Sequence, residues 1–209
     1  MPPLKQGDFM SFYMQVKKWL SGAVRRLYRV EVVHPENEPA EGGYLLCANH
    51  MSNSDVVVIA ACMRKPVYYM AKSELFKVPL VGPLIRAFGA FPVKRGTADV
   101  GAIRTAVRLL NEGEAVGYFP QGRRYAGVDP KTTEIKHGAG LIVYRAQARV
   151  LPVFLSAKGY KIRMFRKTKL IIGKPVPYEE LPYREGTTDE MHAASSEIFQ
   201  RILELEETV

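Results

Sequence analysis

The fold class of this chain can be predicted from one stretch of its sequence, Tyr44-Leu45-Leu46-Cys47-Ala48 followed directly by Asn49-His50-Met51-Ser52-Asn53-Ser54-Asp55. Its first five residues form a nearly continuous apolar run, which is typical of a strand buried on both faces of a parallel sheet. The polar residues that follow lead into an apolar segment, from about 54 to 63, with the length of a helix. A buried strand that passes through a short polar loop into a helix predicts one unit of an α/β domain.

Strand and helix patterns alternate along the rest of the chain. The clearest helix covers 99–111, where Val100, Ile103, Val107 and Leu110 make one apolar stripe. We therefore expect the α/β class, with a mostly parallel central sheet flanked by helices. Further strands are expected at 30–33, 67–70, 90–93, 115–119 and 150–155, with a strand pair within 160–172, and further helices at 80–88, 139–146 and from 187 onward.

The size and composition fit one globular domain, since the chain has 209 residues, of which 47% are hydrophobic and 24% charged. Cys47 and Cys62 lie in apolar surroundings, which predicts small buried hydrophobes in a reducing compartment rather than a disulfide or a zinc site. The formal net charge of +9 indicates an anionic partner, such as nucleic acid, a membrane surface or a phosphate-bearing substrate. The basic residues concentrate before residue 30 and within 158–174, where no acid occurs.

Residues 1–38 are expected to form an N-terminal amphipathic helical segment for membrane contact, ahead of an α/β domain at 39–209. Cations lie between apolar residues that recur at spacings of three and four, and Ser21-Gly22 can divide the segment into two helices. No apolar run approaches the roughly 20 residues of a spanning helix, and no secretory signal is visible. The apolar positions are Phe9, Phe12, Tyr13, Val16, Trp19, Leu20, Ala23, Val24 and Leu27.

An apolar face that carries the only tryptophan and is flanked by cations is typical of a helix lying in the interface of an anionic membrane. We therefore expect the protein at the cell membrane, peripheral or monotopic on the cytoplasmic face. The alternative is a helix that simply packs on the domain.

His50 and Asp55 are the first candidates for chemistry, because ligands gather outside the carboxyl ends of the strands in α/β folds. An aspartate five positions after the histidine, across a polar helix start, can turn its carboxylate onto Nδ1 of the imidazole. Nε2 is then free to take a proton from a hydroxyl group that attacks an acyl carbonyl. The same residues are also compatible with helix capping by Ser52, Ser54 and Asp55 around a hydrogen-bonded turn histidine.

Two later loops place cations and a glycine directly after strands. They are Phe91-Pro92-Val93-Lys94-Arg95-Gly96 and Phe119-Pro120-Gln121-Gly122-Arg123-Arg124. Gly122 permits a tight turn with exposed backbone N–H groups, and the arginine fork matches phosphate oxygens. Beside a His-Asp pair, these loops indicate a site for a phosphate-bearing substrate, although each arginine considered alone is more often a solvated surface charge.

Five sequence blocks, taken in order, resemble those of the glycerolipid acyltransferases, and within that family the bacterial 1-acylglycerol-3-phosphate acyltransferases. The resemblance covers roughly residues 40–160, and five short blocks in the right order are more specific than any one of them. The blocks are Asn49-His50 with Asp55 (an HX4D motif), Lys72-Ser73-Glu74-Leu75-Phe76 with Gly82 and Pro83, Phe91-Pro92-Val93-Lys94-Arg95, Phe119-Pro120-Gln121-Gly122-Arg123-Arg124, and Leu151-Pro152-Val153.

The resemblance implies a membrane enzyme of phospholipid biosynthesis that makes phosphatidate from lysophosphatidate. His50 would take the proton of the sn-2 hydroxyl and Asp55 would orient His50. That hydroxyl would then attack the thioester of acyl-CoA or acyl-carrier protein, which serves as co-substrate, with no cofactor and no metal. Lys72, Arg95 and Arg124 would bind the acceptor phosphate, with Gln121 and Gly122 also placed at the substrate site, and Pro152 would form a wall of the site.

One block departs from the usual family pattern, Phe-Pro-Glu-Gly-Thr-Arg, because Gln121 replaces the glutamate and Arg123 the threonine. Glutamine keeps the shape and can still hydrogen-bond, but it lacks the charge, so we expect it to position neighbouring groups. Arg123 can add a cation to the phosphate site or point to solvent.

Three other functions stay open from the sequence. The acceptor can be another lysolipid or hydroxy-lipid, such as a lyso-ornithine lipid, or the chain can be a non-catalytic lipid-binding member of the same fold. Nucleic-acid binding through the basic stretch 158–174 is the third, and it is not expected because no recognised module is visible. The expected partners are therefore the thioester donor, lysophosphatidate and an anionic membrane surface, with no nucleic acid.

Overall fold

The structure is a computed structural model that describes residues 6–94 and 99–208, with side chains from residue 13 onward. Its elements alternate as expected. The strands are β1 (Val30–Val33), β2 (Tyr44–Ala48), β3 (Val67–Lys72), β4 (Phe91–Val93), β5 (Ala115–Tyr118), β6 (Arg149–Ala157) and β7 (Thr168–Ile172). The α-helices are α1 (Gln6–Leu27), α2 (Ser54–Cys62), α3 (Val81–Ala87), α4 (Val100–Asn111), α5 (Gly138–Ala146) and α6 (Thr188–Glu204), with short 3-10 turns η1 (Pro35–Asn37), η2 (Ser73–Lys77), η3 (Pro130–Thr132), η4 (Lys158–Tyr160), η5 (Tyr178–Glu180) and η6 (Leu205–Thr208).

The seven described strands form one sheet in the order β1-β7-β6-β2-β5-β3-β4. Every neighbouring pair is parallel except β6 with β7, which confirms the mostly parallel sheet expected from the sequence. Because β2, β3, β4, β5 and β6 run in the same direction, the loops that follow them emerge at one edge. That edge carries the loops predicted to hold the chemistry.

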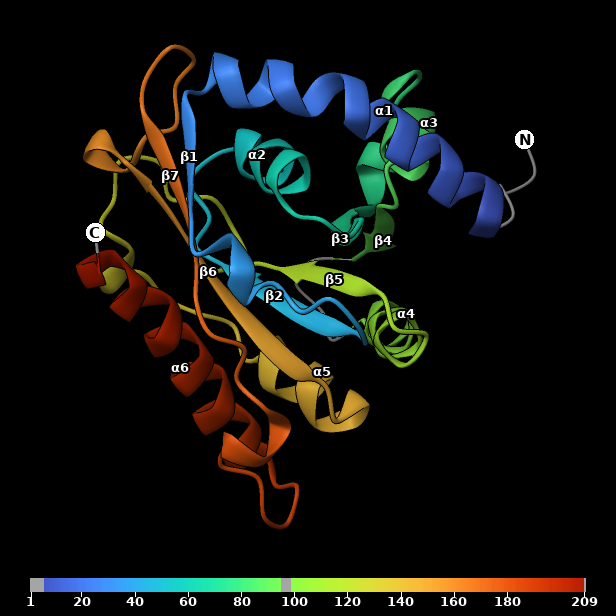
Figure 1. The fold of residues 1–209 in the computed structure, drawn as a ribbon. Helices are drawn as coiled ribbons and strands as arrows, with labels where there is room; N and C mark the ends of the chain where they lie inside the picture. Colours follow the sequence, from blue (N-terminus) through green and yellow to red (C-terminus); the bar gives the residue numbers. More distant parts are fainter. Residues whose placement is uncertain (1–5, 95–98, 209) are drawn as a thin grey trace.

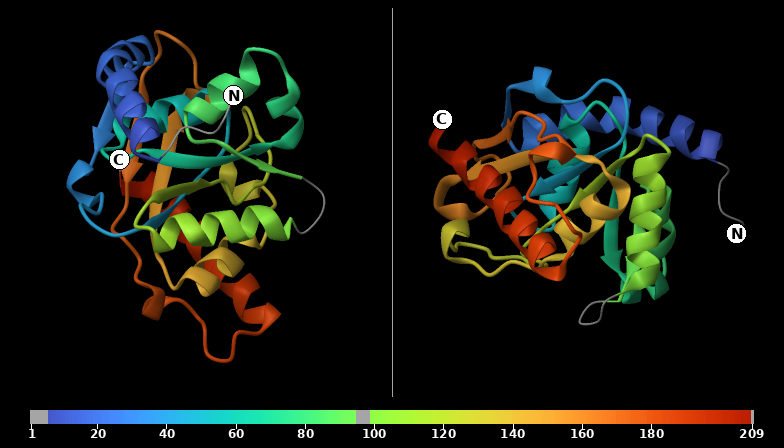
Figure 2. Two further views of the ribbon diagram at one scale, coloured as in Figure 1. Left: turned by 90° about the vertical axis from the view of Figure 1, so that its right-hand side faces the viewer. Right: turned by 90° about the horizontal axis from the view of Figure 1, so that it is seen from below.

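Strand β2 is buried along its whole length and contributes to both faces of the sheet. Tyr44, Leu46 and Ala48 pack in the core beneath α1 and α2, whereas Leu45 and Cys47 pack in the core beneath α4, α5 and α6. Figures 1 and 2 show the resulting three layers, with α1, α2 and α3 on one side of the sheet and α4, α5 and α6 on the other. Burial on both faces explains why the strand reads as an unbroken apolar run.

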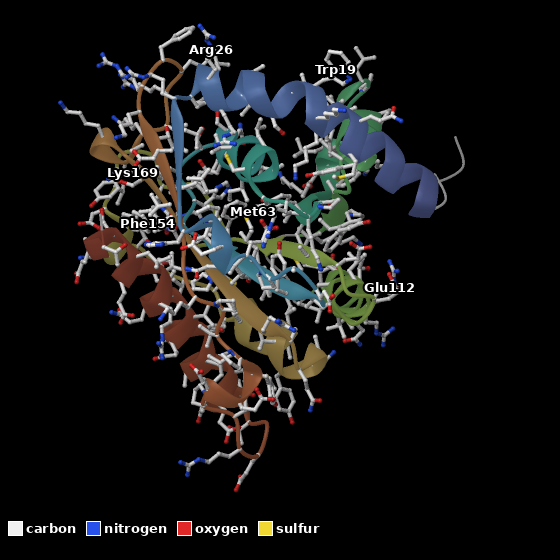
Figure 3. The ribbon with its side chains drawn as sticks, viewed as in Figure 1. Trp19, Arg26, Met63, Glu112, Phe154 and Lys169 are labelled. Atoms are coloured by element: carbon white, nitrogen blue, oxygen red, sulfur yellow. The ribbon has the colours of Figure 1, made fainter. Side chains whose placement is uncertain are left out.

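Helix α1 is a single helix of 22 residues, so the break expected at Ser21-Gly22 does not occur. It is attached to the body, because Tyr13 is buried and Lys17 donates hydrogen bonds to the carbonyls of Met63 and Arg64 just after α2. Trp19, by contrast, is 83% exposed on the outer side of the helix (Figure 3). Among the described residues, no helix has both the length and the apolar character needed to cross a membrane.

The expected boundary at residue 38 falls after the first strand of the sheet. β1 lies within the predicted N-terminal segment, yet it pairs in parallel with β7, which lies near the other end of the chain. The N-terminal segment is therefore joined to the α/β body through this strand as well as through α1.

One local expectation is wrong and another is only partly right. The predicted strand pair within 160–172 is a single strand, β7, because residues 158–167 form a loop that begins with a left-handed Gly159. In α4 the expected Leu110 is buried and Ile103 packs against the core, whereas Val100 is 51% exposed and the other buried side chains are Ala102, Ala106 and Leu109. Small alanine side chains let the helix approach its neighbours closely, so the buried face includes alanines as well as part of the expected stripe.

Candidate active site

The carboxylate of Asp55 is the centre of the candidate site. It is fully buried in the first turn of α2, and its Oδ2 accepts hydrogen bonds from Nδ1 of His50 at 2.7 Å and from the backbone nitrogens of Met51 at 2.6 Å and Ser52 at 2.8 Å. An ionised carboxylate can only accept, so the imidazole proton lies on Nδ1. The predicted His50–Asp55 pair is thus formed, and the carboxylate that could have served only as a helix cap also orients the imidazole.

The imidazole of His50 is held by ring stacking. It lies against Phe119 with ring centroids 4.0 Å apart and an interplanar angle of 16°, and Tyr69 stacks on the other side of Phe119 at 5.9 Å. Gly117 makes room for this stack, because a Cβ there would lie 2.2 Å from the Tyr69 ring. His50 is only 7% exposed, and within the part of the chain that the structure describes its Nε2 makes no hydrogen bond, so no described protein group occupies that nitrogen.

Asn49 anchors the histidine loop to the sheet, and the sequence assigned it no role. Its Oδ1 accepts from the backbone nitrogen of Leu155 at 2.7 Å, and its Nδ2 donates to the carbonyl of the same residue at 3.0 Å. The fully buried amide therefore continues the pairing of β2 with β6 by one step past the end of β2. This bridge fixes the point at which the chain turns into the His50 loop. The only sign of this bridge in the sequence was an asparagine directly before His50.

Gln121 holds the backbone of His50 in place. Its Oε1 accepts from the backbone nitrogen of His50 at 2.6 Å, and its Nε2 donates to Oγ1 of Thr133 at 2.7 Å. The hydroxyl of Thr133 donates in turn to the carbonyl of Pro130 at 2.8 Å. Gln121 is only 2% exposed, so these bonds link the β2 and β5 loops within the protein interior. A direct contact between Gln121 and a substrate stays a prediction.

We expect Gln121→Leu to lower the Tm by about 5 °C. The substitution leaves the buried N–H of His50 without an acceptor, which costs about 1–3 kcal/mol, and each kcal/mol shifts the Tm of a chain of this size by about 2–4 °C. Thermal unfolding followed by circular dichroism measures the shift. Gln200→Leu on the exposed surface of α6 is the matched control and should leave the Tm nearly unchanged. A Tm that is the same in both variants would contradict the linking role of Gln121.

Gly122 and Arg124 bring the β5 loop against the start of α2. Gly122 adopts φ +67°, a left-handed conformation that favours glycine, and the stem of Lys136 packs over it. Arg124 donates from Nη1 to Oδ1 of Asn53, which lies between His50 and Asp55 in the sequence. Arg123 instead lies over the ring of Tyr125 at 4.6 Å, so of the two arginines only Arg124 contacts the histidine loop.

Of the other predicted phosphate ligands, the structure describes Lys72. Lys72 ends β3, and its ammonium group pairs with the exposed Glu74 at 3.3 Å; it forms no hydrogen bond or ion pair with the His50 loop among the described residues. Arg95 lies outside the described residues, and the neighbouring Lys94 donates from its backbone nitrogen to Asp99 at 2.7 Å. Pro152 lies inside β6, paired with Cys47 of β2, and is buried. The substrate roles of Lys72, Arg95 and Pro152 stay predictions.

No group of three or more metal-ligating side chains occurs within residues 6–94 and 99–208. Both cysteines are free thiols, and burial raises the pKa of Cys62 to about 11 and that of Cys47 further still. Neither thiol is therefore ionised near neutral pH, and the candidate site rests on the His50–Asp55 pair.

Comparisons with known proteins identify the family of this chain. The family model described as "Acyltransferase" matches residues 29–156, which contain the His50, Lys72, Arg95 and Gln121 loops. One relative, "1-acyl-sn-glycerol-3-phosphate acyltransferase" of Bacillus subtilis, is 33% identical over 183 residues, which cover 85% of this chain and 88% of the relative. Another protein of that name, from Borreliella burgdorferi, is 26% identical over 144 residues, 68% of this chain and 55% of the relative.

A solved structure has the same fold. The crystal structure of the 1-acyl-sn-glycerophosphate (LPA) acyltransferase PlsC from Thermotoga maritima superposes with a TM-score of 0.67, covering 93% of this chain and 82% of that one at 24% identity. The likeness supports the α/β architecture. Because the family model spans more than half of the chain and the Bacillus relative matches it over most of its length, this chain belongs to the acyltransferase family.

Proposed function

We propose that the chain transfers an acyl group from a thioester donor, acyl-CoA or acyl-carrier protein, to the sn-2 hydroxyl of 1-acylglycerol-3-phosphate, giving phosphatidate. The observation that carries the proposal is the His50–Asp55 pair, with Nδ1 bound to a buried carboxylate and Nε2 available. The names of the relatives, which are 1-acyl-sn-glycerol-3-phosphate acyltransferases, support the choice of acceptor.

In the proposed reaction His50 is a general base. Nε2 takes the proton of the acceptor hydroxyl while the hydroxyl oxygen forms a bond to the thioester carbonyl carbon. The resulting imidazolium is stabilised by the adjacent Asp55 carboxylate. The tetrahedral intermediate then expels the thiolate as the carbon–sulfur bond breaks. His50 returns the proton to the sulfur, so the protein ends in its starting state and the products are the ester and the free thiol.

Direct attack, without an acyl-enzyme, is supported by the state of the nucleophiles. Cys62 has a pKa of about 11 and Cys47 is entirely buried with a pKa raised further by desolvation, so both stay protonated. Ser52 and Ser54, the hydroxyl residues of the histidine loop, are used locally: Oγ of Ser52 accepts from the nitrogen of Ser54, and Oγ of Ser54 bonds the hydroxyl of Tyr28. The acceptor hydroxyl is then the group that His50 activates.

The acceptor phosphate is proposed to bind along the edge formed by the loops after β5, β3 and β4. Arg124 already contacts the His50 loop, and its planar fork can hold two phosphate oxygens at once. Lys72 and Arg95 would add positive charge from the loops after β3 and β4. This arrangement would place the glycerol backbone between the phosphate cations and the imidazole.

Attachment to the membrane is proposed to involve the outer side of α1, peripherally and on the cytoplasmic face. Met14, Trp19 and Leu20 of this helix are exposed, with Trp19 on its outer side (Figure 3), and Arg25 and Arg26 follow in the last turn. Aromatic and aliphatic side chains beside cations suit the headgroup boundary of anionic lipid. The inner side of α1 is engaged by the protein, as the buried Tyr13 shows.

The test is product analysis. The purified chain is placed in anionic vesicles with 1-acylglycerol-3-phosphate and either thioester donor, and lipids are identified by mass spectrometry, with lysophosphatidylcholine and a lyso-ornithine lipid as competing acceptors. We expect phosphatidate as the main product. Product from another acceptor alone would reassign the substrate, and no product from a folded, vesicle-bound protein would indicate a non-catalytic lipid-binding member.

We expect Arg124→Ala to raise the KM for 1-acylglycerol-3-phosphate about 10-fold with a much smaller change for the donor. A charge-assisted hydrogen bond to phosphate contributes about 1.5–3 kcal/mol, and 1.4 kcal/mol is a factor of 10. Steady-state kinetics with each substrate varied in turn measures the split. Arg123→Ala is the matched control, because that neighbouring cation lies over Tyr125. Equal increases in both KM values for Arg124→Ala would argue against a phosphate ligand.

A further inference from the structure

The loop between β6 and β7, residues 158–167 and called here the β6–β7 loop, carries an exposed apolar tip among cations. Phe165 is 72% exposed and Met164 is 55% exposed, although both are large and apolar. Lys161, Arg163 and Arg166 flank them in the sequence and form no ion pair with any described residue, whereas Lys167 pairs with Glu31 at 2.7 Å. The proposed reaction uses none of these residues.

The loop that carries Met164 and Phe165 is held in place by a buried side chain and by a backbone turn. Ile162 is buried in the core beneath α1 and α2, and the nitrogen of Arg166 donates to the carbonyl of Arg163 at 3.3 Å, which closes a turn with Met164 and Phe165 at its centre. Backbone hydrogen bonds on both sides of the tip therefore reduce the freedom of these two side chains.

The tip is also joined to the end of α1. The nitrogen of Phe165 donates to the carbonyl of Leu27 at 2.6 Å, and the nitrogen of Thr168 donates to the carbonyl of Arg29 at 3.4 Å. Figures 1 and 2 show the loop rising beside this end of the helix, and Figure 3 places Arg26 next to it. The cations of the loop and those of the last turn of α1, Arg25 and Arg26, therefore lie on one continuous surface.

The backbone of Phe165 is unfavourable for its side chain. Its φ is +63°, in the left-handed region that bulky side chains disfavour. Glycine would suit this turn position better. The sequence therefore places an aromatic ring in solvent, at a backbone position that disfavours it, and folding alone gives no reason for that choice.

We propose that the β6–β7 loop is a second membrane-docking element, with Met164 and Phe165 entering the acyl boundary of an anionic bilayer while Lys161, Arg163 and Arg166 contact lipid phosphates. This inference rests on the proposed function, which requires a lipid acceptor, and extends the contact beyond α1. An apolar tip ringed by cations matches the layered chemistry of a bilayer surface, apolar inside and anionic outside. A nucleic-acid backbone would use the cations but would leave the paired methionine and phenylalanine without a partner.

The test is sedimentation of the full chain with vesicles of phosphatidylglycerol and phosphatidylcholine. Met164→Ser/Phe165→Ser should lower the partition coefficient about 10-fold, since two apolar side chains no longer enter the bilayer. Arg163→Glu/Arg166→Glu should lower it by roughly 20-fold or more at low salt, and the wild-type binding should weaken as salt screens the cations. The matched controls are Val100→Ser and Arg104→Glu/Arg184→Glu, which make the same changes at exposed sites on other elements and should bind like the wild type.

Phe165→Gly separates binding from folding. Glycine relieves the left-handed conformation, so the Tm should be unchanged or higher while vesicle binding falls. Loop variants that bind vesicles as well as the controls would overturn the proposal. Loss of DNA-duplex binding in Arg163→Glu/Arg166→Glu, with vesicle binding intact, would also overturn it and assign the cations to nucleic acid.

Turnover of a water-soluble substrate separates membrane docking by the loop from catalysis. With a short-chain, water-soluble 1-acylglycerol-3-phosphate, the loop variants should keep the wild-type kcat/KM, because no bilayer is needed. Loss of that turnover in the loop variants would place the loop in substrate handling and overturn the docking role. Absence of turnover in the wild type would count against the proposed reaction. The contribution of α1 to vesicle binding is measured separately, with the variant Trp19→Ser.

Discussion

Replacing His50 with alanine is expected to lower kcat for phosphatidate formation by about 10²- to 10⁴-fold, the usual contribution of a positioned general base. The reason is geometric: His50 is the side chain whose Nε2 is available beside Asp55, and its ring is fixed by Phe119. The KM for each substrate should change much less, because the proposed phosphate ligands lie on other loops. Rates are measured by mass spectrometry of the phosphatidate formed with time.

The matched control for this prediction is His192→Ala. His192 is an exposed histidine of α6 whose ring is stacked on that of His137, with the ring centroids 3.9 Å apart. It does not belong to the His50 loop, so its removal should leave kcat near the wild-type value. The circular dichroism spectrum of both variants shows whether each is folded. A folded His50→Ala variant with wild-type kcat would rule out the general-base role and favour a different origin of catalysis.

Asp55→Asn is expected to lower kcat by about 10²- to 10⁴-fold, because the neutral amide no longer stabilises the imidazolium that forms when His50 takes the proton. Oδ2 of Asp55 accepts three N–H groups, from His50, Met51 and Ser52, so an amide must either present its single oxygen to all three or turn its own N–H groups toward them. In the first arrangement the amide nitrogen takes the place of Oδ1, a buried atom with no hydrogen-bond partner among the described residues, and in the second the N–H groups of the amide face other N–H groups. Initial rates at saturating donor and acceptor measure kcat.

The double variant His50→Ala/Asp55→Asn gives the sharper comparison. If Asp55 acts through His50, the double variant should be no slower than His50→Ala alone, because residues that work as a unit are non-additive. Independent, multiplied losses would show that Asp55 supports catalysis by another route. Asp189→Asn, in the exposed first turn of α6, is the control for removing a carboxylate and should retain the wild-type rate.

Most strands and helices could be predicted from local patterns. β2 was recognisable because burial on both faces demands an unbroken apolar run. The start of α6 was recognisable from a threonine followed three residues later by a glutamate, and in the structure Oγ1 of Thr187 accepts from the nitrogen of Glu190. The buried face of α4 could be predicted only in part, since Ala102 and Ala106 face the core while the larger Val100 is exposed. Hydrophobicity marks residues that can be buried, but the distance to the neighbouring layer decides which side of a helix is used.

The same division applies to the candidate site. The α/β class and the His50–Asp55 pair could be predicted from the sequence, because five residues around one helix start are enough to bring a carboxylate onto an imidazole. Three other contacts could be seen only in the folded protein: Gln121 holds the backbone of His50 across 71 positions, Asn49 ties the loop to Leu155 across 106, and Lys17 turns inward to the end of α2. These contacts depend on the order of strands in the sheet and on how the layers pack, and the spacing of residues along a chain does not specify which distant segment becomes a neighbour.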